Sequence, residues 1–529
     1  MSRIVSASLQ RLRKALVDRD VETGFMTLDR LFALGHWPKP GSAGSYALLF
    51  LLAQWCDLGY RDIDFFERQL AGFARVKRRT LTVSDYLDLR FAEVYAAFAR
   101  GSMDEAVAVL RALLHAHADV LDYHALFVAW FWYGRAQRVE GAFDDALHSI
   151  RMARAAATQA GAEKLDAVAK VHESWLLFYR GERQGAFDLL DQAEHTLSPT
   201  GHALSLGNIA SARGRFYRHA GDYTRALGFF EQAIELYRSQ VPNHPNLGRA
   251  LVNAAYVKRL QTMKLQPVRG GKALAAAHAR MLQVVHEAME LLRSAREIYT
   301  ACRHEAGMGS VMIHMGHLQL ESGDIDAATY EAEAAFKLAE SRNDAVLRAR
   351  SLILQAYVEM SRSEEQMEST WYSGSPAQHA VDLAQSALEF AQQTRNRRLT
   401  AAAQITRGLA ATDPALSDWD VALSCATSAA ELLGSEERDH LFNELTVLRR
   451  RIVQSQSLDL NWRRWVNGET SGSSYQQIEE EFASVVIPQV WMRMGKNTSA
   501  VARHLRISPK KIRRALQNAQ QLGVRKSNL

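Results

Sequence analysis

The stretch GDYTRALGFFEQAIEL, residues Gly221–Leu236, decides the fold of this chain. Its first glycine can adopt the positive φ that ends one helix, and the aspartate after it can cap the N-terminus of the next. Alanines follow at Ala226 and Ala233, and small residues at such spacing let two antiparallel helices approach closely. The stretch therefore predicts a helix that begins after a tight turn and packs against the helix before it.

The same pattern recurs along the chain at intervals of forty residues. The glycines at this position, each followed five residues later by alanine, are Gly101, Gly141, Gly181 and Gly221. Later alanines in the same role are Ala288, Ala328, Ala380 and Ala422, with insertions near Gly270 and Trp371. A unit of this size cannot bury its apolar face alone, so the units must stack. We expect an all-α array of antiparallel helix pairs wound into a superhelix.

Two of these units, EGAFDDALHSIRMARAA and AGDYTRALGFFEQAIELYR, resemble the tetratricopeptide repeat, or TPR. The resemblance covers about residues 81–440, and the period of forty rather than about 34 residues implies longer helices. Residues 1–80 look helical but lack the signature, so we expect them to cap the array. The resemblance also implies that the first helix of each unit lines a concave face that binds a peptide or protein.

The residues that the resemblance assigns to this concave face are mostly cationic. They are Arg135, Arg138, Asn208, Arg215, Arg218, Arg249 and His317. Arginines spaced i and i+3 lie on one face of a helix and could clamp a carboxylate, an acidic peptide or a phosphate. Arginines are also common on solvated helix surfaces, so an unliganded polar face is the alternative.

The C-terminus differs in charge from the rest of the chain. The last 48 residues contain ten Lys or Arg and no Asp or Glu, so the net charge of +6 leaves −4 on the preceding residues. If the protein has a polyanion partner, that partner should therefore bind here. Within this segment, Val501, Ala502 and Leu505 have helical spacing, as do Ile512 and Leu516.

Two short helices joined by a tight turn form a helix-turn-helix, and Ser508 followed by Pro509 is a strong start for the second helix. Its polar face would enter a major groove, with Lys511 and Arg503 at the sides against the DNA backbone. The residues predicted to bind DNA are Arg503, Ser508, Lys510, Lys511, Arg513, Arg514 and Gln517.

This segment resembles the C-terminal domain of the Fis family of bacterial DNA-binding proteins. The motif residues present are Gly495, Asn497, Val501, Ala502, Leu505, Ile507 and Ser508, and the preceding helix over 475–494 lies where that family dimerises. Arg506 replaces a turn glycine common in the family, and Pro488 interrupts the preceding helix. A LuxR-type helix-turn-helix fits loosely as well, and a solvated basic tail is the third alternative. We expect a DNA-binding domain over 475–529, joined through a helical extension and flexible linker over 441–474.

Other classes of protein find little support. The longest apolar run, Tyr46–Trp55, is too short to span a bilayer, and three distant cysteines suit a reducing cytoplasm. His304 and Glu305 begin a zinc-protease-like HEAGM, but the second histidine is missing, and no phosphate loop, nucleophile elbow or dinucleotide motif occurs. We expect no enzymatic activity, no metal, no cofactor and no membrane contact.

The sequence thus predicts a cytoplasmic, bacterial-type transcriptional regulator. A TPR array would sense a peptide, protein or small ligand, and a C-terminal helix-turn-helix would read a two-fold operator as a homodimer. The alternative is a non-enzymatic interaction scaffold or adaptor, including one that serves stress or phage defence, with a basic docking tail.

Overall fold

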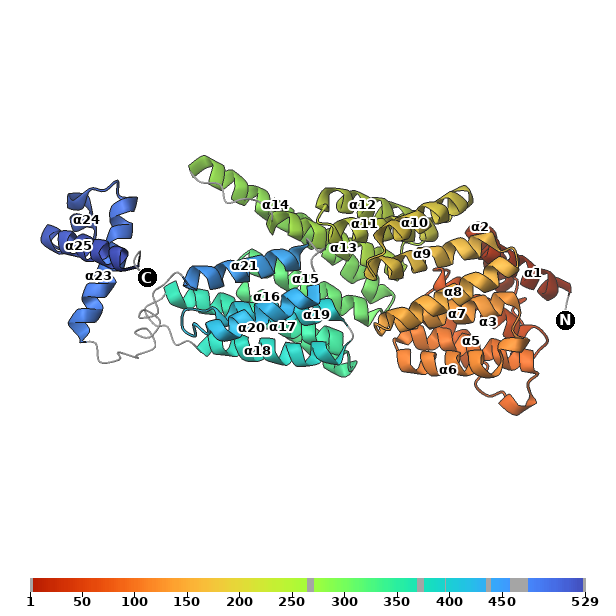
Figure 1. Ribbon diagram of the computed structural model, residues 1–529. Helices are drawn as coiled ribbons and strands as arrows, with labels where there is room; N and C mark the ends of the chain where they lie inside the picture. Colours follow the sequence, from red (N-terminus) through yellow and green to blue (C-terminus); the bar gives the residue numbers. More distant parts are fainter. Residues whose placement is uncertain are drawn as a thin grey trace. The chain divides into compact units, whose positions relative to one another are not determined.

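A computed structural model describes residues 3–263, 271–368, 375–394, 396–433, 439–456 and 474–526. Its regular structure is helical, with no strand within these ranges (Figure 1). The chain divides into two compact units, Met1–Leu448 and Arg449–Leu529, called the array unit and the C-terminal unit below. The predicted all-α fold is confirmed.

The array unit begins with four helices that precede the recognisable repeats. They are α1 (Arg3–Asp18), α2 (Val21–Ala33), α3 (Ser45–Asp57) and α4 (Ile63–Ala71). Their buried side chains join those of the first repeats in one continuous core, which extends from Val5 to Phe216. The prediction that residues 1–80 cap the array stays a prediction.

The helices that follow are successive long segments. They are α5 (Val83–Arg100), α6 (Met103–Ala116), α7 (Tyr123–Val139), α8 (Phe143–Gln159), α9 (Glu163–Tyr179), α10 (Arg183–Leu197), α11 (Ala203–His219), α12 (Tyr223–Gln240), α13 (Pro245–Met263), α14 (Gly271–Ala301), α15 (Glu305–Glu321), α16 (Ile325–Ser341), α17 (Ala345–Glu368), α18 (Ser375–Gln393), α19 (Arg397–Ala411), α20 (Trp419–Leu433) and α21 (His440–Gln456). From α5 to α20 each odd-numbered helix packs against the even-numbered helix that follows it.

The small residues of the repeat act as the sequence predicts. The eight alanines from Ala106 to Ala422 that define the period are all fully buried. Gly221 has φ +75° between α11 and α12, a conformation that residues with a Cβ rarely adopt. On the first helix of this pair, a Cβ on Gly214 would lie 2.9 Å from Cε1 of Phe230. Glycine and alanine therefore set the close approach of paired helices.

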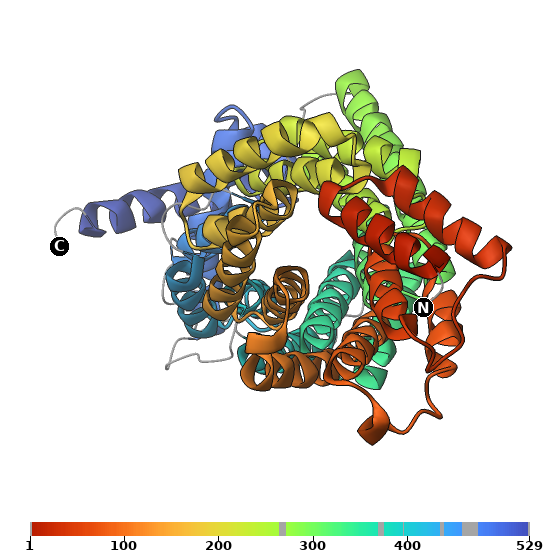
Figure 2. The ribbon, with the colours of Figure 1, turned by 90° about the vertical axis from the view of Figure 1, so that its right-hand side faces the viewer.

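Figure 2 shows the helix pairs wound around a common axis. The residues that face this axis line a cavity of the array unit, called the channel below. Hydrogen bonds tie distant parts of the wall together. Nε2 of His244, just before α13, donates to the carbonyl oxygen of Asp57 at the end of α3, 3.1 Å away. Asp439, just before α21, forms an ion pair with Arg398 of α19 and lies 3.7 Å from Nδ1 of His219 on α11. These contacts join residues that lie far apart in the chain.

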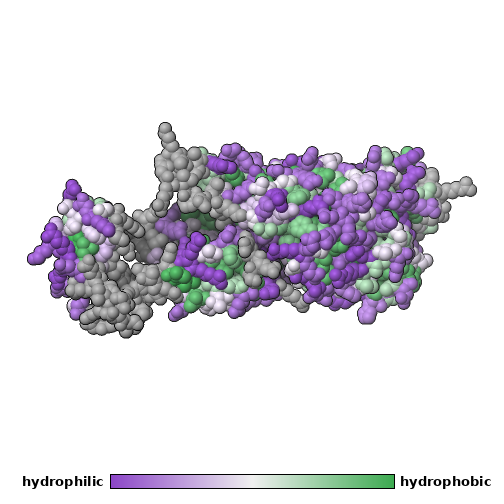
Figure 3. All heavy atoms as spheres, turned by 45° about the horizontal axis from the view of Figure 1, so that its top comes forward, coloured by the Kyte–Doolittle hydropathy of each residue, from purple (hydrophilic) through white to green (hydrophobic). Residues whose placement is uncertain are grey.

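The outer face of the array unit seen in Figure 3 is largely hydrophilic, as expected where solvent covers the second helices of the pairs. None of the described helices is both long and apolar enough to cross a membrane.

The C-terminal unit contains α23 (Tyr475–Arg493), α24 (Thr498–His504) and α25 (Pro509–Lys526). Their shared core contains Ile487, Val501, Ala502, Ile512 and Ala515. Helix α23 is unbroken at Pro488. Most of the predicted linker, residues 457–473, lies outside the described residues, as do residues 264–270 and 369–374 of the two predicted insertions.

Candidate functional site

A cavity of about 1580 Å³ occupies the channel of the array unit. It is larger than the roughly 300–1,000 Å³ typical of small-molecule pockets. Eleven arginines and four carboxylates line it, so its formal charge is strongly positive. Odd-numbered helices from α7 to α19 supply side chains to this lining. Their polar residues recur three, four or seven positions apart because one face of each helix points inward.

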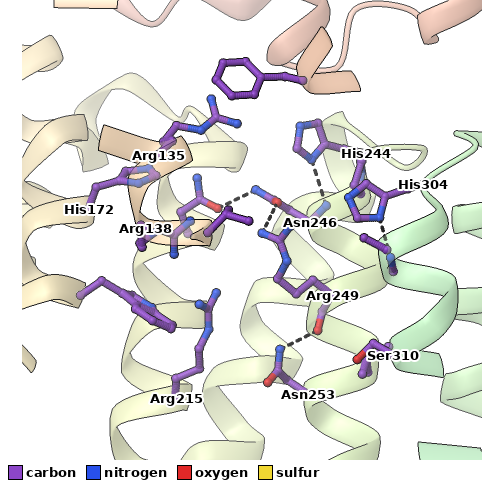
Figure 4. A pocket seen from close by; sticks show the side chains of 18 of the residues that line it. Arg135, Arg138, His172, Arg215, His244, Asn246, Arg249, Asn253, His304 and Ser310 are labelled. Atoms are coloured by element: carbon purple, nitrogen blue, oxygen red, sulfur yellow. Dashed lines mark hydrogen bonds between the residues drawn. The ribbon is translucent and has the colours of Figure 1, made fainter. Parts of the chain in front are cut away.

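All seven residues predicted for the concave face line this one cavity. Figure 4 shows Arg135, Arg138, Arg215 and Arg249 entering it from three neighbouring helices, α7, α11 and α13. The assignment of these residues to ligand binding stays a prediction.

Arg135 is held by a partner within the protein. Its Nη1 lies 2.6 Å from Oδ2 of Asp57 and its Nη2 lies 3.2 Å from Oδ1, a bidentate pair. Nε1 of Trp132 donates to the same carboxylate over 3.2 Å. Although burial opposes ionisation of Asp57, the guanidinium of Arg135 holds its pKa below the usual value. Arg135 therefore joins α7 to the end of α3.

Arg138 and Arg215 have different surroundings. Their guanidinium carbons lie 5.2 Å and 4.6 Å from the centre of the Trp175 ring, which projects from α9 between their two helices. Such cation–π contacts stabilise a cation without neutralising it. Among the described residues no carboxylate pairs with either arginine, and the Nε of each is buried without a hydrogen-bond partner.

Arg249 stands at one end of a polar chain. Its Nη1 donates to Oδ1 of Asn246 over 3.0 Å, and Nδ2 of Asn246 donates to Oδ1 of Asn208 over 2.8 Å. The hydroxyl of Tyr237 donates to that same oxygen of Asn208. Asn208 thus positions the residues around it, and Arg249 is the member of the chain most exposed to the cavity (Figure 4).

Arg218 and His317 line the same cavity. Nη1 of Arg218 donates to Oδ1 of Asn253 over 2.6 Å, and its guanidinium lies over the ring of Tyr256. The ring of His317 meets that of Tyr357 edge-on. Burial, followed by repulsion from Arg259, holds the pKa of His317 well below its ordinary value, so this histidine is neutral.

Several histidines line the cavity. Burial and then the charge of Arg138 hold the pKa of His172 well below its usual range. In the part of the chain that the structure describes, no three His, Cys, Asp or Glu side chains gather with the geometry of metal ligands. The described lining brings cations, amides and aromatic rings together.

The sequence analysis missed Trp175, His172 and Asn246. One signal was available for the tryptophan, because Arg135, Trp175 and Arg215 are spaced by forty residues and occupy the same position in successive units. Ser174 stands where Gly134 and Gly214 precede the two arginines, so the repeat position of Trp175 was not recognised.

A second candidate site lies on the C-terminal unit. Ile512 and Ala515 of α25 are buried, whereas Lys510, Arg513 and Gln517 are exposed on the opposite face of that helix. Four residues separate α24 from α25, and Arg506 among them has φ +51°. The turn therefore keeps the left-handed conformation that a glycine would adopt more easily. Asn497 caps α24 by accepting from the amides of Ser499 and Ala500.

The remaining predicted DNA contacts divide into two groups. Arg503 and Ser508 are exposed, and the hydroxyl of Ser508 accepts from the amide of Lys511 as the cap of α25. Nζ of Lys511 lies 2.6 Å from Glu479, and Nη2 of Arg514 lies 2.9 Å from Glu480, both on α23. The sequence analysis did not foresee these ion pairs, which offset part of the positive charge of α25.

Comparison with protein families identifies one segment of the chain. A family model described as tetratricopeptide repeat matches residues 205–263, which span α11 to α13. No curated protein matches the chain.

Three solved structures illustrate the similarities in shape. The apo quorum sensor NprR from B. thuringiensis is 13% identical, covers 72% of this chain and 98% of its own, and has a TM-score of 0.47. Human IFIT1, solved as a dimer with m7Gppp-AAAA, is 13% identical over 86% and 90% of the two chains, also at 0.47. Yeast Tom70 is 12% identical over 89% and 93%, at 0.38. At these identities and TM-scores the similarities carry no conclusion about function.

Proposed function

We propose that this protein is a ligand-responsive DNA-binding regulator. The array unit takes up a peptide, a segment of a protein or a small ligand in its cationic cavity, and the C-terminal unit binds duplex DNA. The observation that carries the DNA-binding role is the exposed face of α25, where Lys510, Arg513 and Gln517 lie opposite the buried Ile512. Arginine and glutamine on one face of a helix can read base edges, and lysine can meet phosphate.

In the mechanism that we propose, two copies of the chain dimerise and place two α25 helices on a two-fold operator. Ligand in the cavity alters the curvature of the array or the pairing of the two copies. Either change alters the spacing of the two helices and therefore the affinity for the operator.

A gel-shift comparison of the full-length chain with a 1–470 truncation tests the DNA-binding role. The array unit has its own core, so the truncation retains the ligand cavity. We expect full-length protein to bind duplex DNA at physiological salt and the truncation not to bind. Equal binding by both proteins, or none by either, contradicts the proposal.

The ion pairs of Lys511 and Arg514 with α23 favour one second candidate function. Cations already neutralised within their own unit contribute less to binding a polyanion. A non-enzymatic scaffold whose C-terminal unit docks on an acidic protein would keep the array as an interaction surface. Absence of DNA binding by the full-length chain, with retention of ligand in the cavity, would favour this scaffold.

A further inference from the structure

Six of the eleven arginines that line the cavity show two kinds of surroundings. Arg135, Arg259 and Arg398 each pair with a carboxylate of the protein, namely Asp57, Glu321 and Asp439. A structural role in joining helices therefore explains why these three arginines are present. Arg138, Arg215 and Arg249 have no such partner among the described residues, although all three enter the same part of the cavity (Figure 4).

The unpaired arginines are positioned by contacts that leave their charges intact. Trp175 lies within 5.2 Å of the guanidinium of Arg138 and 4.6 Å of that of Arg215. Nη2 of Arg215 donates to the hydroxyl of Ser211 over 3.1 Å, and Arg249 donates to Asn246. An indole face, a hydroxyl and an amide orient a guanidinium, and its remaining N–H groups can still donate to a ligand.

Three like charges in one half-buried region destabilise the free protein. Burial, together with Arg249 and Arg138, lowers the pKa of Arg215 to about 9. Burial, together with Arg249 and Arg135, lowers the pKa of Arg138 to about 10. Packing alone does not require such charges, because a neutral side chain could fill the same space beside Trp175. An anion would remove the repulsion and satisfy the free donors.

We propose that Arg138, Arg215 and Arg249 bind an oxyanion of the ligand, either a carboxylate or a phosphate, beside Trp175. This inference rests on the proposed ligand-binding role of the array and is independent of DNA binding. The planar guanidiniums suit bidentate bonding to either group, and Asn246 supplies a polar neighbour. The volume of the cavity leaves room for a peptide or nucleotide attached to the oxyanion.

The test measures anion binding by the full-length chain at fixed ionic strength. Inorganic pyrophosphate and a tetraglutamate peptide are titrated into wild type, Arg138→Gln, Arg215→Gln and the control Arg238→Gln. Arg238 is exposed near the end of α12 and does not line the cavity. Calorimetry gives the affinity, thermal unfolding gives the stability of each free protein, and tetraglutamine serves as the uncharged peptide.

We expect at least one anion to bind wild type and Arg238→Gln in the millimolar range or tighter. Either cavity substitution should lower the affinity for this anion about tenfold or more, because the loss of one charge-assisted hydrogen bond costs about that much. The free Arg138→Gln and Arg215→Gln proteins should melt no lower than wild type, which separates lost binding from lost folding. The anion that binds identifies the source of the oxyanion as peptide or phosphate.

Two results would overturn the inference. One is equal anion affinity in wild type and the cavity variants, and the other is no anion binding by wild type at millimolar concentration. A gel shift on the same samples reports the DNA-binding role separately, so the two proposals can fail independently.

Discussion

At the scale of the residue, one repeat position serves different purposes in successive units. Arg135, Trp175 and Arg215 are equivalent in sequence, forty residues apart. Asp57 neutralises Arg135. The ring of Trp175 contacts the guanidinium of Arg215, which has no carboxylate partner among the described residues. Asp57 belongs to α3, far from these repeats in sequence, so only the folded superhelix distinguishes a structural arginine from one available to a ligand.

Replacing Arg135 by Gln should destabilise the protein. The substitution leaves the partly buried carboxylate of Asp57 without its cation, although Trp132 still donates to it. Because Arg135 is partly exposed, we expect a loss of about 1–2 kcal/mol in the free energy of unfolding, measured by denaturant titration. The exposed control Arg238→Gln should change it by less than about 0.5 kcal/mol. A variant as stable as that control would show that the tie between α3 and α7 is not needed.

On the C-terminal unit, Arg513→Ala and Lys511→Ala should affect DNA binding differently. Arg513 is exposed opposite the core, so its loss should relax sequence preference at a cost of about 1–3 kcal/mol on the preferred site. Lys511 already pairs with Glu479, so its loss should weaken all sequences similarly and only slightly. Binding constants on a selected site and on random duplex DNA check both statements. Equal losses for both variants on both DNAs would contradict the assignment of α25 as the recognition helix.

At the scale of the element, the helix pairs depend on positions where a side chain does not fit. Gly214 of α11 is buried against the ring of Phe230 on α12, and a comparable contact joins Gly134 of α7 with Ile150 of α8. A methyl group on Gly214 would force the ring aside in an interior that is already close-packed.

Gly214→Ala and Gly228→Ala form a matched pair. A Cβ on Gly214 would meet the ring at 2.9 Å, so this variant should lose about 1–3 kcal/mol of stability. Gly228, on the exposed face of α12, has open space around it, so its substitution should add about 0.5–1 kcal/mol through helix propensity. Thermal and denaturant unfolding measure both effects. Stabilisation by both substitutions would show that the two helices can separate without cost.

The elements could be predicted from the sequence because their signals are local. The spacing of glycine and alanine fixed the pairs, and the eight defining alanines are buried as expected. The cavity residues were predicted by position within the repeat, and all seven line one cavity. The partners of Arg135 in the cavity and of Lys511 on the C-terminal unit could not be predicted, because Asp57 and Glu479 come from other helices. Trp175 was not predicted, because Ser174 replaces the glycine that marks this position in the neighbouring units.

At the scale of the whole molecule, burial of many histidines makes the array sensitive to acid. Burial, with different neighbouring charges, lowers the pKa of His219, His244 and His304 to about 4 and that of His440 to about 3. Two of these histidines, His219 and His244, take part in the contacts that tie distant turns of the wall. The folded array therefore requires neutral imidazoles at these places.

Stability should consequently fall as the pH falls. In the unfolded chain these histidines titrate near 6.5, so below that pH the unfolded state binds protons that the folded state does not. With several such groups we expect the melting temperature to drop on the order of 10 °C between pH 7.5 and 5.5. His314→Gln should make the decline shallower, because burial, followed by Arg350, also keeps the pKa of His314 well below its usual value. A melting temperature independent of pH over this range would contradict the prediction.

The central claim, that the chain reads DNA through α25, is tested most directly by the salt dependence of duplex binding. Lys496, Arg503, Arg506, Lys510 and Arg513 are exposed cations for which the described residues provide no carboxylate partner. If they neutralise about five phosphates, the logarithm of the binding constant should fall with that of the salt concentration at a slope of about −4.5 per protomer. Fluorescence anisotropy of a labelled duplex gives this slope, and the double variant Lys510→Ala, Arg513→Ala should reduce its magnitude by about 2. No binding at physiological salt, or an identical slope for wild type and the double variant, would contradict the account.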